Sequence, residues 1–101
     1  MVEKTSVGEQ MVSERLAALS AKSFDELAAL PSVSSEDVVL DSKKFILSVW
    51  HDALESGEHQ IVVQAYKPWF LGIGKMRAAG FRINSRNERQ ALSEEELWPF
   101  T

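Results

Sequence analysis

His51 and His59 are the two histidines of the chain, and carboxylates that could ligate a cation or exchange protons stand close to them. These neighbours are Asp52, Glu55 and Glu58. The zinc-protease pattern HExxH does not occur, and exposed polar residues around a turn account for the same composition. A metal or acid/base enzyme at His51 and His59 is therefore the least favoured of three functions. We expect no metal and no cofactor.

Two glycines precede a lysine in the segment Gly72-Ile73-Gly74-Lys75, and glycines let backbone N–H groups approach a phosphate. The spacing of these glycines matches neither of the two common phosphate-binding motifs. A Walker loop needs glycine where Trp69 stands, and a dinucleotide fingerprint needs glycine where Arg77 stands. The chain also has no cysteine and no GxSxG elbow. We therefore predict a turn between two strands here, and a chain without enzymatic activity.

Aromatic and basic side chains are interleaved over the segment 66–89. Aromatic residues, methionine and arginine are enriched at the centres of protein interfaces. Aromatic side chains also stack on unpaired bases, while lysine and arginine contact phosphates. The pI of about 5.1 disfavours a nucleic-acid partner. We predict a protein-interaction or small regulatory domain, with self-association as a homodimer included; the alternative is a weak binder of single-stranded nucleic acid or another polyanion through segment 67–89. The candidate partner-binding residues are Tyr66, Trp69, Phe70, Lys75, Arg77, Arg86 and Arg89.

The net charge of −4 hides an uneven distribution of acids and bases. Residues 1–59 contain eleven acids and five bases, whereas residues 60–92 contain six bases and one acid. This division indicates either charge pairing inside the chain or an anionic partner for the basic segment. We expect recognition from Arg86 and Arg89, which lie in or just after a predicted turn, and internal pairing with the acids of residues 1–59 from Arg82.

With 101 residues, of which 45% are apolar and 26% charged, the chain has the size and composition of one globular domain. We expect residues 1–6 to be disordered and residues 7–101 to form a single α+β domain. The sequence has no apolar run of the ~20 residues that a membrane-spanning helix needs, and its first residues do not resemble a secretion signal. These features predict a cytoplasmic protein without a membrane partner.

The first third of the chain has helical patterns. Apolar residues recur at helical spacing up to Ala21, and Ser23 with Glu26 has the form of a capping box that starts a second helix before Pro31. Residues 31–35 then read as a loop. A second capping box, Ser93 with Glu96, predicts a short helical turn near the C-terminus.

From Asp37 onward, β-branched and aromatic residues alternate with turn-forming ones. This predicts an antiparallel meander of three to four strands, with the N-terminal helices packed on it. Residues 42–56 also fit a helical template, and we predict a strand there because apolar residues occupy both faces. The predicted strands are Val38–Leu40, Lys44–Leu54, Gln60–Lys67 and Lys75–Asn84.

The alternation also predicts which side chains share a face of the sheet. One face should form the core under the helices. The opposite face is too apolar for water and should be covered by residues 97–100, by a helix or by a second subunit. The core face comprises Phe45, Leu47, Val49, Ile61, Val63, Ala79, Phe81 and Ile83, and the opposite face comprises Ile46, Trp50, Val62, Tyr66 and Met76.

Overall fold

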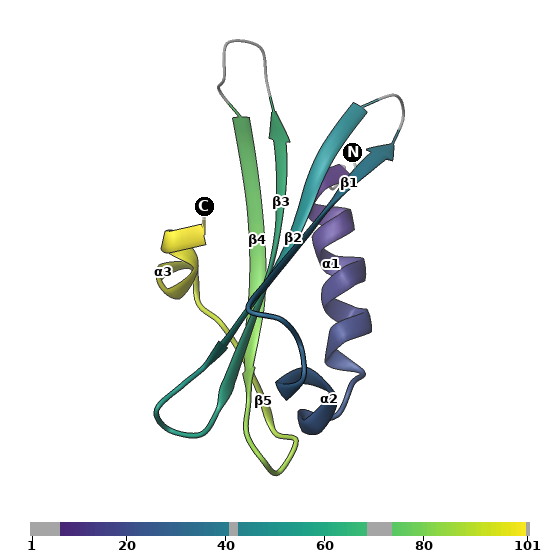
Figure 1. Ribbon diagram of the computed structural model, residues 1–101. Coiled ribbons are helices and arrows are strands. Elements are labelled where there is room, and N and C mark those ends of the chain that lie inside the picture. The colour runs from purple at the N-terminus through teal and green to yellow at the C-terminus, as the bar shows by residue number, and fades with distance from the viewer. Residues whose placement is uncertain (1–6, 41–42, 69–73, 101) are drawn as a thin grey trace, which may run out of the picture.

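The computed structural model describes residues 7–40, 43–68 and 74–100, and it has the predicted α+β fold (Figure 1). Two helices precede an antiparallel sheet, and a short helix follows it. None of the helices described is long and apolar enough to cross a bilayer. The elements are α1 (Val7–Ser20), α2 (Phe24–Ala28), β1 (Val33–Leu40), β2 (Lys43–Ala53), β3 (His59–Pro68), β4 (Gly74–Ile83), β5 (Arg89–Ala91), α3 (Glu94–Leu97) and the 3-10 helix η2 (Trp98–Phe100).

The five strands form one sheet in the order β1-β2-β3-β4-β5, so each strand pairs with the next along the chain. A tight turn joins β2 to β3, where the N–H of Leu54 donates to the carbonyl of Glu58 at 2.8 Å. Gly57 supplies the left-handed backbone of this turn with a φ of 90°. The strand predicted over residues 44–54 is confirmed, and the helix considered for residues 42–56 is wrong, because β2 pairs with both β1 and β3.

One face of the sheet, which we call the inner face, carries the hydrophobic core. Successive strand residues point to opposite sides, so cross-strand partners such as Val49 and Val63 meet on this face. The core residues predicted from the alternation are confirmed, with Ala79 partly buried against them, and α1 packs over β3 and β4. The buried apolar residues of this core cluster are Met11, Val12, Leu19, Leu27, Phe45, Leu47, Val49, Ile61, Val63, Ala65, Phe81 and Ile83, and Val62 is buried on the opposite face.

The predicted capping box starts α2. Oγ of Ser23 accepts from the N–H of Glu26 at 3.3 Å, and Oε1 of Glu26 accepts from the N–H of Ser23 at 3.2 Å. The N–H of Phe24 donates to Oδ1 of Asn87 at 2.8 Å, which joins α2 to the turn between β4 and β5. Leu27 then enters the core without exposed surface. This short helix is therefore fixed at both its start and its buried face.

The structure differs from the predicted meander at two places. β1 begins at Val33, whereas the sequence indicates a loop over residues 31–35 and a strand from Val38. β5 is a fifth strand that the sequence does not indicate, and its three residues are all exposed. Neither segment shows apolar alternation, because their extended conformation comes from pairing with a longer neighbour: β1 pairs along β2, and β5 pairs with the end of β4.

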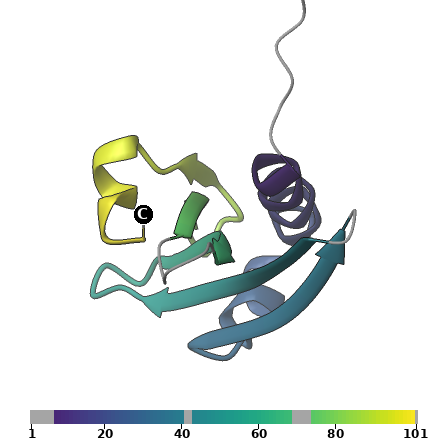
Figure 2. The same ribbon diagram turned by 90° about the horizontal axis from the view of Figure 1, so that it is seen from above.

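The opposite, outer face of the sheet is covered at β4 by the C-terminal segment, and Figure 2 shows α1 and α3 on opposite sides of this strand. Leu92 comes close because Gly80 has no side chain: a Cβ at Gly80 would lie 2.8 Å from Cδ1 of Leu92. The predicted cover by residues 97–100 is partial, since Leu97 is half-buried whereas Trp98 is 72% exposed. The outer face of β1 and β2 remains accessible at Val33, Val39 and Trp50.

Candidate interaction surface

The candidate partner-binding residues do not form one surface among the residues described. Tyr66 lies on the outer face of β3, opposite Ile46, whereas Arg77 lies on the inner face, opposite Ala65. Arg86 and Arg89 lie at the far end of the sheet, around the turn between β4 and β5. Lys75 lies in β4, but its side chain is outside the described part of the structure, as are the whole residues Trp69 and Phe70.

Several bases of the segment are engaged inside the chain. Nε of Arg77 donates to Oε1 of Glu9 at 3.1 Å, which is a pair between the basic and acidic halves. Arg89 donates from Nη2 to the carbonyl of Lys22 at 2.5 Å and from Nη1 to the carbonyl of Asn87 at 2.7 Å. Arg89 thus joins the segment between α1 and α2 to the turn before β5, and this structural role differs from the predicted role in recognition.

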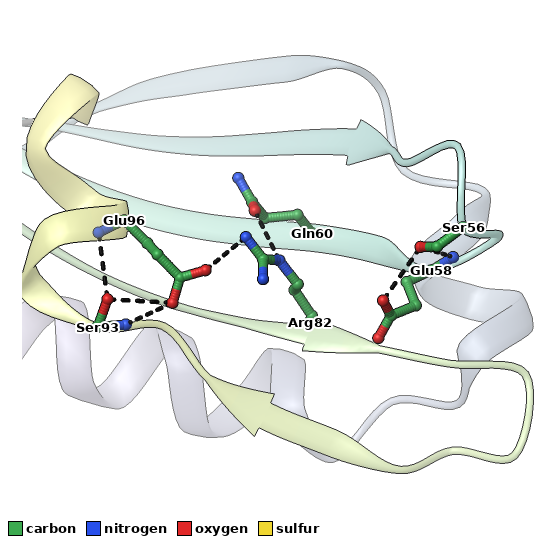
Figure 3. Close-up of polar contacts among 6 residues, drawn as sticks. All are labelled: Ser56, Glu58, Gln60, Arg82, Ser93 and Glu96. Atoms are coloured by element: carbon green, nitrogen blue, oxygen red, sulfur yellow. Dashed lines mark hydrogen bonds and ion pairs between the residues drawn. The ribbon is translucent and has the colours of Figure 1, made fainter.

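Arg82 links the sheet to α3 (Figure 3). Its Nη2 lies 2.5 Å from Oε2 of Glu96, and its Nε donates to Oε1 of Gln60 at 3.1 Å. Oε1 of Glu96 accepts from the backbone N–H of Ser93 at 3.1 Å and completes the predicted capping box. Arg82 is therefore paired inside the chain, as predicted, but with a carboxylate of the C-terminal segment instead of one from residues 1–59.

The two capping carboxylates have lowered pKa values. For Glu26 and for Glu96, the main cause is the backbone N–H that donates to the carboxylate, from Ser23 and Ser93 respectively. The guanidinium of Arg82 also lowers the pKa of Glu96. Both groups stabilise helix starts, so these shifts identify structural caps rather than a reactive site.

The structure brings the two histidines into direct contact. Nε2 of His51 lies 2.6 Å from Nδ1 of His59, and Nδ1 of His51 lies 2.9 Å from the carbonyl oxygen of Leu30. The ring of Phe24 contacts His59 edge to face, with centroids 5.0 Å apart. In the part of the chain that the structure describes, no group of three or more potential ligands gathers around a cation position. Three of the four ring nitrogens make these contacts, which join β2 to β3 and to Leu30, a residue that follows α2.

The longer of the two edge strands of the sheet is β1. Within residues 7–40, 43–68 and 74–100, β1 pairs only with β2. The N–H of His51 donates to the carbonyl of Ser32 at 2.9 Å, which identifies Ser32 and His51 as a hydrogen-bonded pair and so shows which residues of β1 bond to β2. Alternate residues of an antiparallel strand bond to the neighbour, so Ser34, Glu36 and Val38 do so here. Consequently Val33, Ser35, Asp37 and Val39 direct their N–H and C=O groups to the open edge.

Two of these four residues, Val33 and Val39, carry exposed apolar surface. Val33 is 47% exposed and Val39 is 70% exposed, and both lie on the outer face of β1. Trp50 stands directly opposite Val33 on β2 and is 36% exposed, and its Nε1 donates to Oε1 of Gln64 at 3.3 Å. We define the β1 edge surface as Val33, Ser35, Asp37, Val39 and Trp50. It combines unpaired strand backbone with apolar side chains, the two components of strand-addition sites.

The inner side of β1 is also accessible, because α1 packs over β3 and β4. Two shallow hollows of about 260 and 220 Å³ lie between α1 and the strands β1 and β2. An ion pair between Arg15 and Glu36 lies beside both hollows. The residues that line them are Met11, Glu14, Arg15, Ala18, Ser34, Ser35, Glu36, Val38, Leu47 and Val49.

The β1 edge surface is acidic at its centre. Oδ2 of Asp37 lies 3.4 Å from Nζ of Lys44, and more than 60% of each side chain is exposed. Glu36 points to the inner side, where it pairs with the half-exposed Arg15. Exposed pairs of this kind contribute about 0–1 kcal/mol, so both carboxylates remain able to contact a further cation.

Sequence reasoning missed this surface because the first half of β1, including Val33 and Ser35, was predicted as a loop or left without a strand. Ser34, Ser35 and Glu36 are polar, and a strand exposed on both sides has no periodic signal. Val33 and Val39 are the one indication, since β-branched residues favour strands.

Comparison of the chain with protein-family models, with curated proteins and with solved structures found no match.

Proposed function

We propose that this chain is a non-enzymatic protein-interaction domain that binds its partner by strand addition at β1. The open edge of β1 carries the proposal. It offers the backbone groups of four alternate residues to an incoming strand, and Val33 and Val39 flank them with apolar contacts. An open strand edge of this length promotes aggregation unless a partner covers it, so its presence here is consistent with a role in binding.

Two other functions receive less support. For a polyanion binder, three bases of segment 67–89 are occupied inside the chain, namely Arg77, Arg82 and Arg89, and the open edge is acidic. For an enzyme at His51 and His59, the rings contact each other and the carbonyl of Leu30, which supports a structural role for them.

Replacing Ser35 with proline tests strand addition directly. The N–H of Ser35 points to the open edge, so Ser35→Pro removes a donor for the incoming strand without removing a bond between β1 and β2. Ser35→Ala is the matched control, because both variants lose the 2.8 Å hydroxyl contact with Ser48 but only proline lacks the N–H. The two variants should melt at similar temperatures.

We expect tagged protein and the Ser35→Ala variant to capture the same protein from a lysate of the native host, and Ser35→Pro to lose it. On binding, the backbone amides of Val33, Ser35, Asp37 and Val39 should become protected from hydrogen exchange. Equal capture by Ser35→Pro and Ser35→Ala would contradict strand addition. A captured nucleic acid in place of a protein would favour the polyanion alternative.

A further inference from the structure

We infer that the strand accepted by β1 belongs to a different protein and carries two adjacent basic residues between apolar ends. This inference rests on the proposed function and specifies its partner. It follows from the charges of Glu36 and Asp37 at the centre of β1 and from the identity of the residues whose backbone faces the open edge.

A second copy of the chain is a poor occupant for this edge. In a two-fold antiparallel pair of β1 strands, the outward-facing residues Val33, Ser35, Asp37 and Val39 must pair among themselves. The register that aligns Val33 with Val39 places Glu36 opposite Glu36 of the second copy. The register centred on Asp37 places Asp37 opposite its own copy. Like charges directly opposite each other destabilise a strand pair, so these two registers are disfavoured. A register centred on Val38 avoids such oppositions, but it pairs only residues 36–40 and leaves Val33 outside the ladder.

A register centred on Ser35 avoids these oppositions but leaves Val39 outside the ladder. It pairs only residues 33–37, and it still brings four carboxylates to one short junction, two from each copy. The acidic excess of residues 1–59 adds to this repulsion. The edge therefore discriminates against its own copy, as charged residues do on many edge strands.

A basic strand has the opposite relation to the same edge. In an antiparallel arrangement, its residues opposite Glu36 and Asp37 are adjacent and should be lysine or arginine, and its residues opposite Val33 and Val39 should be apolar. The carboxylate of Asp37 is 63% exposed beside Lys44, so a second ammonium group can reach it. The sequence Val-Thr-Lys-Lys-Thr-Thr-Val, read from its N-terminus, satisfies all four positions against Val39 through Val33.

This peptide, capped at both ends, is the probe for the inference. The comparison peptides carry Thr-Thr or Glu-Glu in place of Lys-Lys. Two cross-strand charge pairs should give the Lys-Lys peptide an affinity about fivefold to tenfold above that of the Thr-Thr peptide, and the Glu-Glu peptide should bind more weakly than either. The advantage should shrink as salt is added. Titrations followed by the amide resonances of β1 give these affinities and locate the binding.

N-methylation separates strand addition from simple charge attraction. The third and fifth residues of the peptide lie opposite Asp37 and Ser35, and their N–H groups point to β1. Methylation of these two nitrogens should abolish binding, whereas methylation of the fourth and sixth, which point away, should preserve it. In the Asp37→Lys variant, the preference should move from the Lys-Lys towards the Glu-Glu peptide.

The outcomes distinguish the inference from the proposed function. Equal affinities for the Lys-Lys and Thr-Thr peptides, with the expected methylation pattern, would overturn the basic partner and leave strand addition intact. Absence of any shift in β1 with all three peptides would overturn both. A dimer in sedimentation experiments that Ser35→Pro dissociates and Ser35→Ala retains would show that a second copy occupies the edge, against the inference.

Discussion

Nε2 of His51 lies 2.6 Å from Nδ1 of His59, and the two rings stack with centroids 4.9 Å apart. Nδ1 of His51 lies 2.9 Å from the carbonyl oxygen of Leu30. Because a carbonyl oxygen only accepts, Nδ1 of His51 carries the proton, and Nε2 of the neutral ring accepts from His59. The pair thus joins β2 to β3 and to the residues that follow α2.

We expect His51→Phe to lower the free energy of unfolding by about 1–3 kcal/mol, because it removes both hydrogen bonds and leaves the carbonyl of Leu30 without this donor. His59→Phe removes one bond and keeps an aromatic ring beside Phe24, so its loss should be smaller. Chemical denaturation orders the two variants, and ¹⁵N shifts of the ring report which nitrogen of His51 is protonated. A proton on Nε2 of neutral His51 would contradict the assignment.

Arg89 and Arg86 should behave differently, although the sequence predicts recognition by both. Arg89 donates to the carbonyls of Lys22 and Asn87, so Arg89→Ala should lower the free energy of unfolding by about 1 kcal/mol. The side chain of Arg86 is exposed, and its backbone N–H donates to Oδ1 of Asn84, a bond that alanine would also make. Arg86→Ala should therefore change the free energy of unfolding by less than about 0.5 kcal/mol. Equal melting temperatures for the two variants would assign no structural role to Arg89.

The hydrophobic alternation was sufficient to predict the central part of the fold. Phe45, Leu47 and Val49 alternate with residues of the outer face, and burial of that alternation against α1 and α2 determines the strand. The helical template over the same residues fails because the register with β3 places Val49 opposite Val63 in the core. When an apolar pattern fits both a helix and a strand, the strands and helices that pack against it in the folded chain decide between the two. The sequence alone does not show which elements those are.

The β1 edge surface could not be predicted from local pattern. Whether Ser34, Ser35 and Glu36 are extended depends on the length of β2, and whether they lie at an edge depends on the order of strands in the sheet. The contact of His51 with His59 is similar: the register pairs His51 with Ile61, so the two rings meet diagonally. The open edge of β1 and the contact between the two histidines both result from how the strands pair in the sheet. The residues involved have no local sequence pattern that would predict either feature.

Gly80 should tolerate no side chain. An added Cβ would lie 2.4 Å from the carbonyl oxygen of Ile61 and 2.8 Å from Cδ1 of Leu92, so Gly80→Ala should lower the free energy of unfolding by about 1–3 kcal/mol. Removing the flexible contact with Leu92→Ala should recover little of this loss, because the carbonyl belongs to the backbone of β3. Thermal melts of the two single variants and the double variant measure the coupling. An unchanged melting temperature in Gly80→Ala would show that β3 and β4 separate readily here.

Glu96 should make the stability of the chain depend on pH in the acidic range. Its folded pKa is below the ordinary value of 4.5, first because the N–H of Ser93 donates to it and also because Arg82 is near. Since the unfolded state takes up a proton at higher pH than the folded state, the contribution of Glu96 is complete above about 4.5 and is lost as the pH falls through the lowered folded pKa. In thermal melts, Glu96→Gln should therefore differ most from the parent near neutral pH, and the two should converge in acid. Glu26→Gln is the matched control, because Glu26 caps α2 in the same way without an arginine partner among the residues described, and it should show the same direction of change. A difference between parent and Glu96→Gln that stays constant from neutral to acidic pH would show that the carboxylate charge does not hold α3 to Arg82.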